Sequence, residues 1–155
     1  MGPASDGAAA RPDWLRYVLL WVQMAFGSHS LISGLNHFVP LFRLSGGDPA
    51  LSPIGPFMGA MIDVGLYDWV KLIELVVGLC LLSGVFVPAA ALIELPISIV
   101  IFYLCVVIDR SPNIVFSGVR ELGFNLFIVA CYARPLLGLA VPRSEPSPLW
   151  RAPRR

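Results

Sequence analysis

Apolar residues dominate four stretches of the chain, each close to the roughly 20 residues that a helix needs to cross a bilayer. The stretches cover residues 17–42, 69–87, 88–108 and 118–139. Residues 84–88, Gly-Val-Phe-Val-Pro, join the second and third stretches without a charged side chain. A turn this short makes these two stretches antiparallel neighbours. The pattern therefore predicts an all-α fold, a four-transmembrane-helix antiparallel bundle.

The longest connection lies between the first and second stretches and has its own pattern. Residues 45–49 (Ser-Gly-Gly-Asp-Pro) and 52–56 (Ser-Pro-Ile-Gly-Pro) are typical of turns. Residues 57–69 then mix apolar and acidic side chains, which predicts a short amphipathic or re-entrant helix at the membrane surface. The chain is thus expected to comprise a flexible N-terminal segment (1–14), a membrane domain (15–139) and a disordered Pro/Arg-rich tail (140–155).

The composition agrees with a membrane protein whose main partner is the lipid bilayer. Hydrophobic residues make up 57% of the 155 positions and charged residues 14%, against about 25% charged in soluble domains. The mean hydropathy is +0.77. The net charge of +1 leaves no basic surplus for nucleic acid, which we do not expect as a partner. Cys80, Cys105 and Cys131 lie in apolar runs without a C-x-x-C pair, so they are expected to be small buried hydrophobes.

The positions of lysine and arginine predict the orientation of the spans. One side of the predicted bundle holds seven arginines, Arg11, Arg16, Arg134, Arg143, Arg151, Arg154 and Arg155. The other side holds four basic residues, Arg43, Lys71, Arg110 and Arg120. Because basic residues concentrate in the cytoplasm, the sequence predicts a multi-pass cell-membrane protein with both termini cytoplasmic.

The first stretch carries polar residues on one face. At about 100° per residue, one stripe contains Gln23, Gly27, Ser30, Gly34 and His37, and His29, Ser33 and Asn36 form an adjoining stripe. Large apolar side chains occupy the opposite side. Small residues let neighbouring helices approach closely, and polar side chains bond across helices in a membrane. We therefore expect the polar face to point into the bundle.

The other three stretches each carry one glutamate, Glu74, Glu94 and Glu121. A carboxylate at membrane depth is costly unless it is paired, so all three should point inward, with Lys71 and Arg120 placed to neutralise two of them. The predicted pocket in the outer half of the bundle contains His29, Ser33, Asn36, His37, Lys71, Glu74, Glu94, Arg120, Glu121 and Asn125. Glu94 is the exception, because it lies towards the cytoplasmic half: it is expected in a second, deeper polar site or in a cavity that reaches inwards from the first, beside Pro96, whose missing N–H frees a helical carbonyl.

Two motifs resemble a known family. Residues 27–38 (GSHSLISGLNHF) and 74–91 (ELVVGLCLLSGVFVPAAA) are similar to the DoxX-like four-helix integral membrane proteins, and the resemblance extends over residues 15–137. It implies a four-helix bundle that is a subunit or assembly component of a membrane redox system. Some relatives act with quinone in sulphur oxidation, so a quinone is the cofactor it suggests. The implied partners are a membrane or peripheral redox subunit, or further copies of the chain. No catalytic residue carries over.

Three other interpretations stay open, and the sequence does not decide whether the protein is an enzyme. The polar residues could serve only to hold the bundle together as a scaffold. A metal could bind His29, His37, Glu74 and Glu121, although the Glu-x-x-His pairs of dinuclear bundles are missing. An oligomer could transport a small solute or protons along the ionisable residues.

Overall fold

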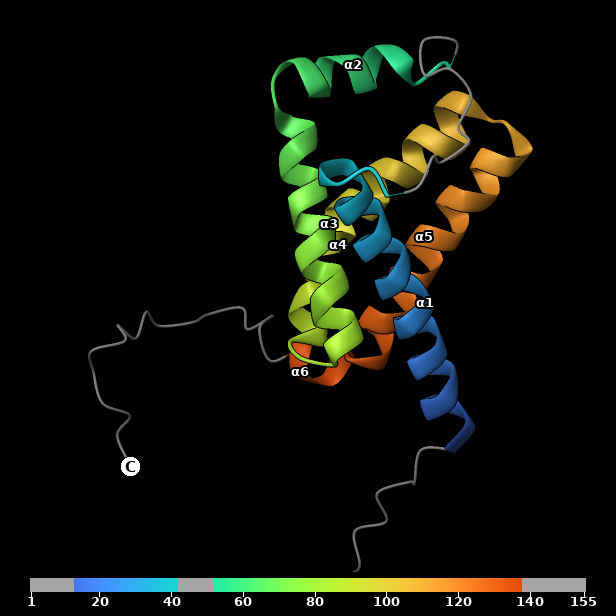
Figure 1. Cartoon of the computed structure of the whole chain (residues 1–155). Coiled ribbons are helices and arrows are strands. Elements are labelled where there is room, and N and C mark those ends of the chain that lie inside the picture. The colour runs from blue at the N-terminus through green and yellow to red at the C-terminus, as the bar shows by residue number, and fades with distance from the viewer. Residues whose placement is uncertain (1–12, 42–51, 138–155) are drawn as a thin grey trace, which may run out of the picture.

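In the computed structural model, residues 13–41 and 52–137 are described, and every regular element within them is helical. The elements are α1 (Asp13–Phe38), α2 (Gly55–Asp63), α3 (Leu66–Ser83), α4 (Val87–Tyr103), the π-helical η2 (Leu104–Asp109), α5 (Pro112–Cys131) and α6 (Ala133–Leu137). The long helices α1, α3, α4 and α5 alternate in direction, and α2 lies across one end of them (Figure 1). The expected all-α class is confirmed for this part of the chain.

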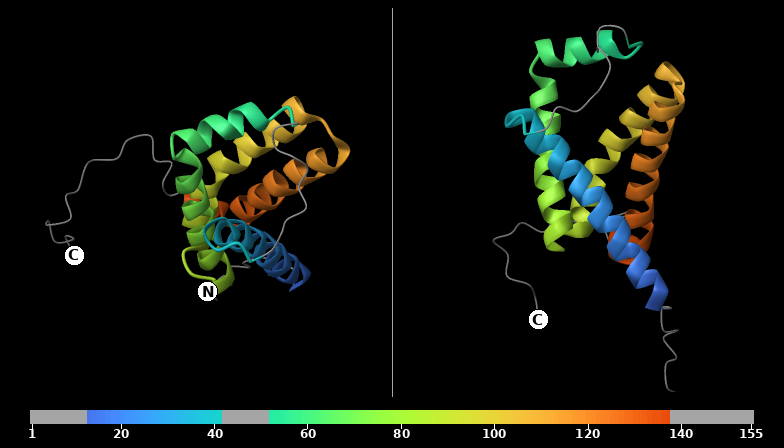
Figure 2. Two further views of the ribbon diagram at one scale, coloured as in Figure 1. Left: turned by 45° about the horizontal axis from the view of Figure 1, so that its top comes forward. Right: turned by 45° about the vertical axis from the view of Figure 1, so that its right-hand side comes forward.

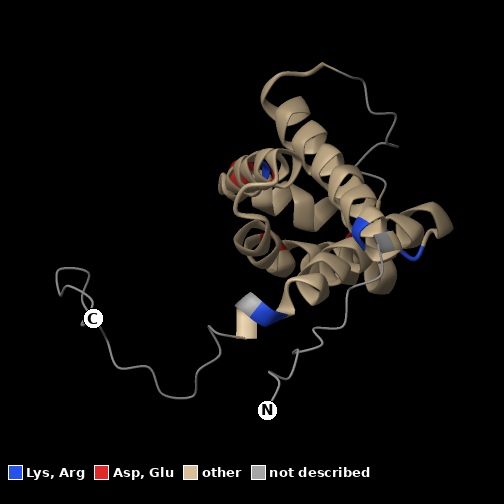
Figure 3. Ribbon diagram, turned by 90° about the horizontal axis from the view of Figure 1, so that it is seen from below, with Lys and Arg blue, Asp and Glu red and all other residues tan. Residues whose placement is uncertain are grey.

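Among the described residues, three helical segments are long and apolar enough to cross a membrane, namely Trp14–Phe38, Val87–Asp109 and Pro112–Cys131. Many of their large apolar side chains are exposed, including Trp21 at 64% and Ile93 at 56%, as lipid-facing residues would be. Charged positions are sparse along the ribbon (Figure 3). Helix α3 does not qualify on the same criteria, because its 18 residues include Asp68, Lys71 and Glu74.

Several helix boundaries differ from those expected. Helix α1 begins at Asp13, inside the segment expected to be flexible, and ends at Phe38 rather than near residue 42. Helix α5 begins at Pro112 instead of residue 118, because proline is favoured at the first helical position, where its missing N–H has no bond to make. The rest of the flexible segment and the tail expected at 140–155 lie outside the described residues.

The single helix expected over residues 57–69 is wrong in extent. Helix α2 ends at Asp63, and α3 begins three residues later at Leu66. Between them Gly65 has φ 72°, a left-handed conformation that glycine adopts without the steric cost met by other residues. The chain turns there from α2 into α3, so residues 66–69 belong to the long helix.

The tight turn expected between α3 and α4 is confirmed. Gly84 has φ 73°, and the next N–H, that of Val85, donates to the Cys80 carbonyl at 3.1 Å. This is the usual glycine-terminated end of a helix. Across the interface, the Gln23 side chain of α1 donates to the Leu81 carbonyl at 2.7 Å, and this carbonyl in the last turn of α3 also accepts from the Gly84 N–H at 3.3 Å.

Helices α1 and α3 make the most extensive packing of the fold through two glycines. A Cβ atom on Gly34 would lie 2.6 Å from the Lys71 carbonyl oxygen, and one on Gly78 would lie 2.5 Å from the Leu31 nitrogen. The hydrophobic core lies towards the α3–α4 turn and contains Val22, Phe26, Val77, Leu81, Val87, Ala90, Ala91 and Ile128. Towards α2, α3 and α4 diverge (Figure 2, right). The polar residues of the site lie between the core and α2.

Candidate functional site

Lys71 and Glu74 form a buried ion pair on α3 that also reaches α1. The Lys71 ammonium donates to the two Glu74 carboxylate oxygens at 2.9 and 2.7 Å and to the Ser33 hydroxyl at 2.8 Å. These contacts use all three of its donors. Lys71 is 9% exposed and Glu74 is 4% exposed. The three-residue spacing predicted this pairing, and the buried lysine therefore has its charge balanced within its own helix.

The Lys71–Glu74 pair lines an open-sided cavity of about 350 Å³ bounded by α2, α3, α4 and the start of η2, which we call the α2 cavity. Apart from Lys71, Glu74 and Tyr67, its lining is apolar: Phe57, Met58, Met61, Leu66, Val70, Pro96, Ile97, Val100, Ile101 and Leu104. The Lys71 nitrogen lies 5.1 Å from the centre of the Tyr67 ring, within cation–π range. The volume falls in the range of small-molecule sites, about 300–1,000 Å³.

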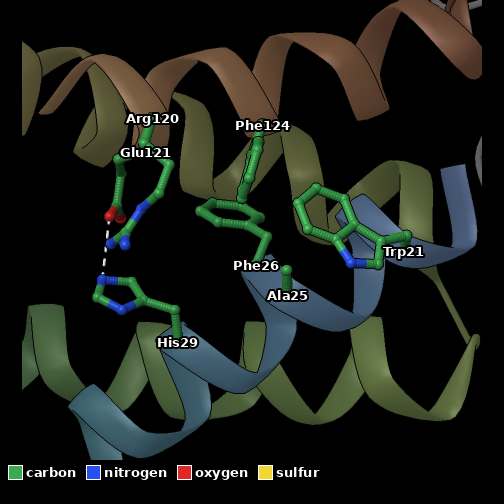
Figure 4. Close-up of a pocket in the computed structure, with 7 residues that line it drawn as sticks. All are labelled: Trp21, Ala25, Phe26, His29, Arg120, Glu121 and Phe124. Atoms are coloured by element: carbon green, nitrogen blue, oxygen red, sulfur yellow. Dashed lines mark ion pairs between the residues drawn. The ribbon is translucent and has the colours of Figure 1, made fainter. Parts of the chain in front are cut away.

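A second pocket lies between α1 and α5, and we call it the His29 pocket. Its volume is about 230 Å³, and its lining is Trp21, Ala25, Phe26, His29, Arg120, Glu121 and Phe124. His29 Nε2 lies 3.1 Å from a Glu121 carboxylate oxygen, and Arg120 extends from α5 towards α1 beside this contact (Figure 4). The His29 side chain is 46% exposed and that of Glu121 only 6%.

Glu94 on α4 is the most buried charged residue described. Its exposure is 0%, and neither carboxylate oxygen has a hydrogen-bond partner within residues 13–41 and 52–137. It interacts electrostatically with Glu74, Glu121 and Lys71, so it lies near both ion pairs without joining either. The side chain of Glu94 thus points into the bundle, as expected of a carboxylate on an apolar helix.

Asn125 on α5 binds the backbone of α4 rather than residues at the end of α1. In the orientation that satisfies both ends of its amide, it donates to the Ala91 carbonyl at 2.9 Å and accepts from the Leu95 N–H at 3.2 Å. It also accepts from the Ser98 hydroxyl at 3.0 Å. Its side chain thus bridges a carbonyl and an N–H four residues apart, directly before Pro96, which cannot donate.

His37 and Asn36, expected to meet the buried glutamates, make other contacts near the end of α1. His37 Nε2 is 2.7 Å from the Asp68 carboxylate, and its ring contacts those of Phe38 and Tyr67 edge to face. The Asn36 side chain accepts a hydrogen bond from the Leu41 N–H at 3.0 Å, beyond the end of α1. Sequence analysis did not single out Asp68, because it placed this residue before the membrane span.

The four residues considered as metal ligands do not converge. His29 pairs with Glu121, Glu74 pairs with Lys71, and His37 pairs with Asp68. Within the described part of the chain, no group of three or more His, Cys, Asp or Glu residues is placed to hold a metal ion. The geometry therefore offers no ligand set for the metal interpretation.

The apolar residues of α2 that line the α2 cavity were also missed by sequence analysis. Phe57, Met58 and Met61 have the spacing of one helical face, and this spacing was the available signal.

Comparisons of the chain with protein-family models, curated proteins and solved structures gave no match. In the part of the chain that the structure describes, the fold is all-helical, with three helices long and apolar enough to cross a membrane and a buried polar layer between two pockets.

Proposed function

We propose that the chain is a multi-pass membrane protein of the DoxX-like type in which α1, α3, α4 and α5 all cross the bilayer. The support for including α3 is its packing against α1 through Gly34 and Gly78, which brings the two helices to the same depth. Lys71 and Glu74 point inward and neutralise each other, while Leu72, Val76 and Leu79 are exposed for lipid. In this arrangement both termini are cytoplasmic and α2 lies at the outer surface.

Within this arrangement, the α2 cavity binds a small amphiphilic molecule of the quinone class, and the chain serves a membrane redox system as a subunit or assembly component. The observation that carries this proposal is the apolar cavity whose lining includes the buried Lys71–Glu74 pair. Such a lining suits a ring with polar carbonyl groups: the walls hold the ring, and the Lys71 ammonium would exchange one of its present hydrogen bonds, to Ser33 or Glu74, for one to a carbonyl oxygen of the ligand. A bound quinone would supply two-electron redox chemistry, with electrons from a partner subunit.

Quinone binding to the purified protein in lipid nanodiscs tests the proposal, with a short-tailed quinone as the titrant. Met61→Trp places a larger side chain in the cavity from α2 while leaving both residues of the ion pair unchanged in identity, and it should weaken binding about tenfold, equivalent to ~1.4 kcal/mol. Ile62→Trp is the matched control, because Ile62 is 57% exposed on the same helix and does not line the cavity. Equal affinities for Met61→Trp and the wild type, or no saturable binding by the wild type, would contradict the proposal.

A further inference from the structure

The buried layer contains three carboxylates on three helices, and their partners differ. Glu74 of α3 contacts Lys71, and Glu121 of α5 contacts His29 of α1. Glu94 of α4 interacts electrostatically with both glutamates and with Lys71, yet no residue in the described chain donates a hydrogen bond to it. Among these three glutamates, Glu94 is the one whose carboxylate oxygens have no hydrogen-bond or ion-pair partner in the described residues.

The surroundings of Glu94 disfavour an ionised carboxylate. Its exposure is 0%, so water does not solvate a negative charge there. Lys71 is the cation that interacts with it, but all three Lys71 donors already bind Glu74 and Ser33. A negative charge on Glu94 would also be repelled by Glu74 and Glu121. A bound proton removes both costs.

Glu94 lies on the helix between the two helices whose glutamates line the two pockets. Helix α4 packs against α3 and α5. Glu74 lines the α2 cavity, and Glu121 lines the His29 pocket on the other pair of helices. Glu94 interacts with both residues from the helix between them. Glu94 therefore has one carboxylate neighbour belonging to each pocket, and exchange of a proton with either would involve no change in oxidation state.

We propose that Glu94 is a proton-binding site in the membrane interior, which exchanges its proton with the α2 cavity by way of Glu74 and with the His29 pocket by way of Glu121. The charged and titratable groups that set its behaviour are Lys71 and Glu74 on α3, Glu121 on α5 and, beyond Glu121, His29 on α1. This site does not depend on which ligand occupies the α2 cavity, so it can be tested without quinone.

Infrared spectroscopy of the protein in nanodiscs at neutral pH tests proton binding, because a protonated carboxyl group has a C=O stretch distinct from that of a carboxylate. The wild type should show this band, Glu94→Gln should lose it, and Asp63→Asn, at an exposed acid on α2, should keep it. A wild type without the band, or a Glu94→Gln protein that retains it, overturns the proposal. If Glu94→Gln does not fold, Glu94→Asp should shift the band, and an unshifted band likewise overturns it.

Deuterium exchange of the same band tests the two routes. A variant without either neighbour combines Glu121→Gln with Lys71→Gln and Glu74→Gln, the last two changed together so that their net charge stays at zero. It should slow hydrogen–deuterium exchange at Glu94 by about 100-fold, which is the lower end of what a positioned proton-transfer group contributes. Loss of either neighbour alone should slow it less, because the other route remains. Exchange at the wild-type rate after removal of both neighbours overturns the assignment of Glu74 and Glu121.

Discussion

Lys71 lies where α1 meets α3, and its ammonium group contacts residues of both helices. It binds Ser33 across the interface and both oxygens of Glu74 within α3. The same side chain lines the α2 cavity. A buried ion pair of this kind adds little net stability, but removing one partner leaves an uncompensated buried charge. Helix packing and the proposed binding site therefore share one residue.

Replacing Lys71 with methionine should reveal this dependence. Lys71→Met leaves the Glu74 carboxylate, 4% exposed, without its partner, and should lower the free energy of unfolding by about 3–5 kcal/mol. Adding Glu74→Leu removes the orphaned charge and should restore most of that loss. Denaturant titration in mixed micelles measures both variants. A double variant as unstable as Lys71→Met alone would show that the two residues are not coupled.

The sequence allowed prediction of the inner part of the site but not of its edge. Helical spacing and the cost of buried charge led to Lys71 with Glu74 and to an inward Glu121. The wheel shows which side of α1 a residue occupies, but not the angle at which α1 crosses its neighbours. That angle places His37 against Asp68 instead of the buried glutamates.

At the scale of helices, the α1–α3 interface depends on two glycines that let the backbones touch. Gly34 packs against the backbone at Lys71 and Leu75, and Gly78 packs against the backbone at Leu31. Without a hydrophobic driving force between helices in lipid, such close packing is a principal source of association. The same approach brings Ser33 within reach of Lys71.

An added methyl group at this interface should separate the helices. In Gly34→Ala the Cβ would lie 2.6 Å from a backbone oxygen, which cannot move aside as a side chain can. We expect about 1–3 kcal/mol of destabilisation from the overpacked contact. Gly123→Ala on α5 is the matched control, since a Cβ there meets nothing within 4 Å. Thermal unfolding in detergent measures both, and an unchanged midpoint for Gly34→Ala would contradict the close packing.

The long apolar stretches allowed prediction of where helices exist, but not of all their ends. Apolar runs of about 20 residues correctly placed α1, α4 and α5. The break at Gly65 was missed because the apolar and acidic residues on both sides continue one helical pattern. A single left-handed glycine between two helices does not change that pattern enough to be recognised. The sequence Gly-Val-Phe-Val-Pro at residues 84–88, by contrast, was recognisable as a turn.

For the whole molecule, the decisive question is the depth of α3. If α3 crosses the bilayer beside α1, then α2 lies at one membrane surface and the α3–α4 turn at the other. The α2 cavity and the buried carboxylates then lie within the bilayer, where apolar ligands arrive from lipid and unpaired charge is costly. The proposed roles of the α2 cavity and of Glu94 both assume this depth.

The accessibility of single cysteines to a membrane-impermeant thiol reagent tests this arrangement most directly. In a chain without its native cysteines, Val64→Cys lies before α3 and Phe86→Cys follows it, and the native side chains are 76% and 75% exposed. We predict that intact cells label Val64→Cys from outside and that Phe86→Cys reacts only after permeabilisation. Labelling of both positions from the same side would show that α3 does not cross the membrane and would contradict the account.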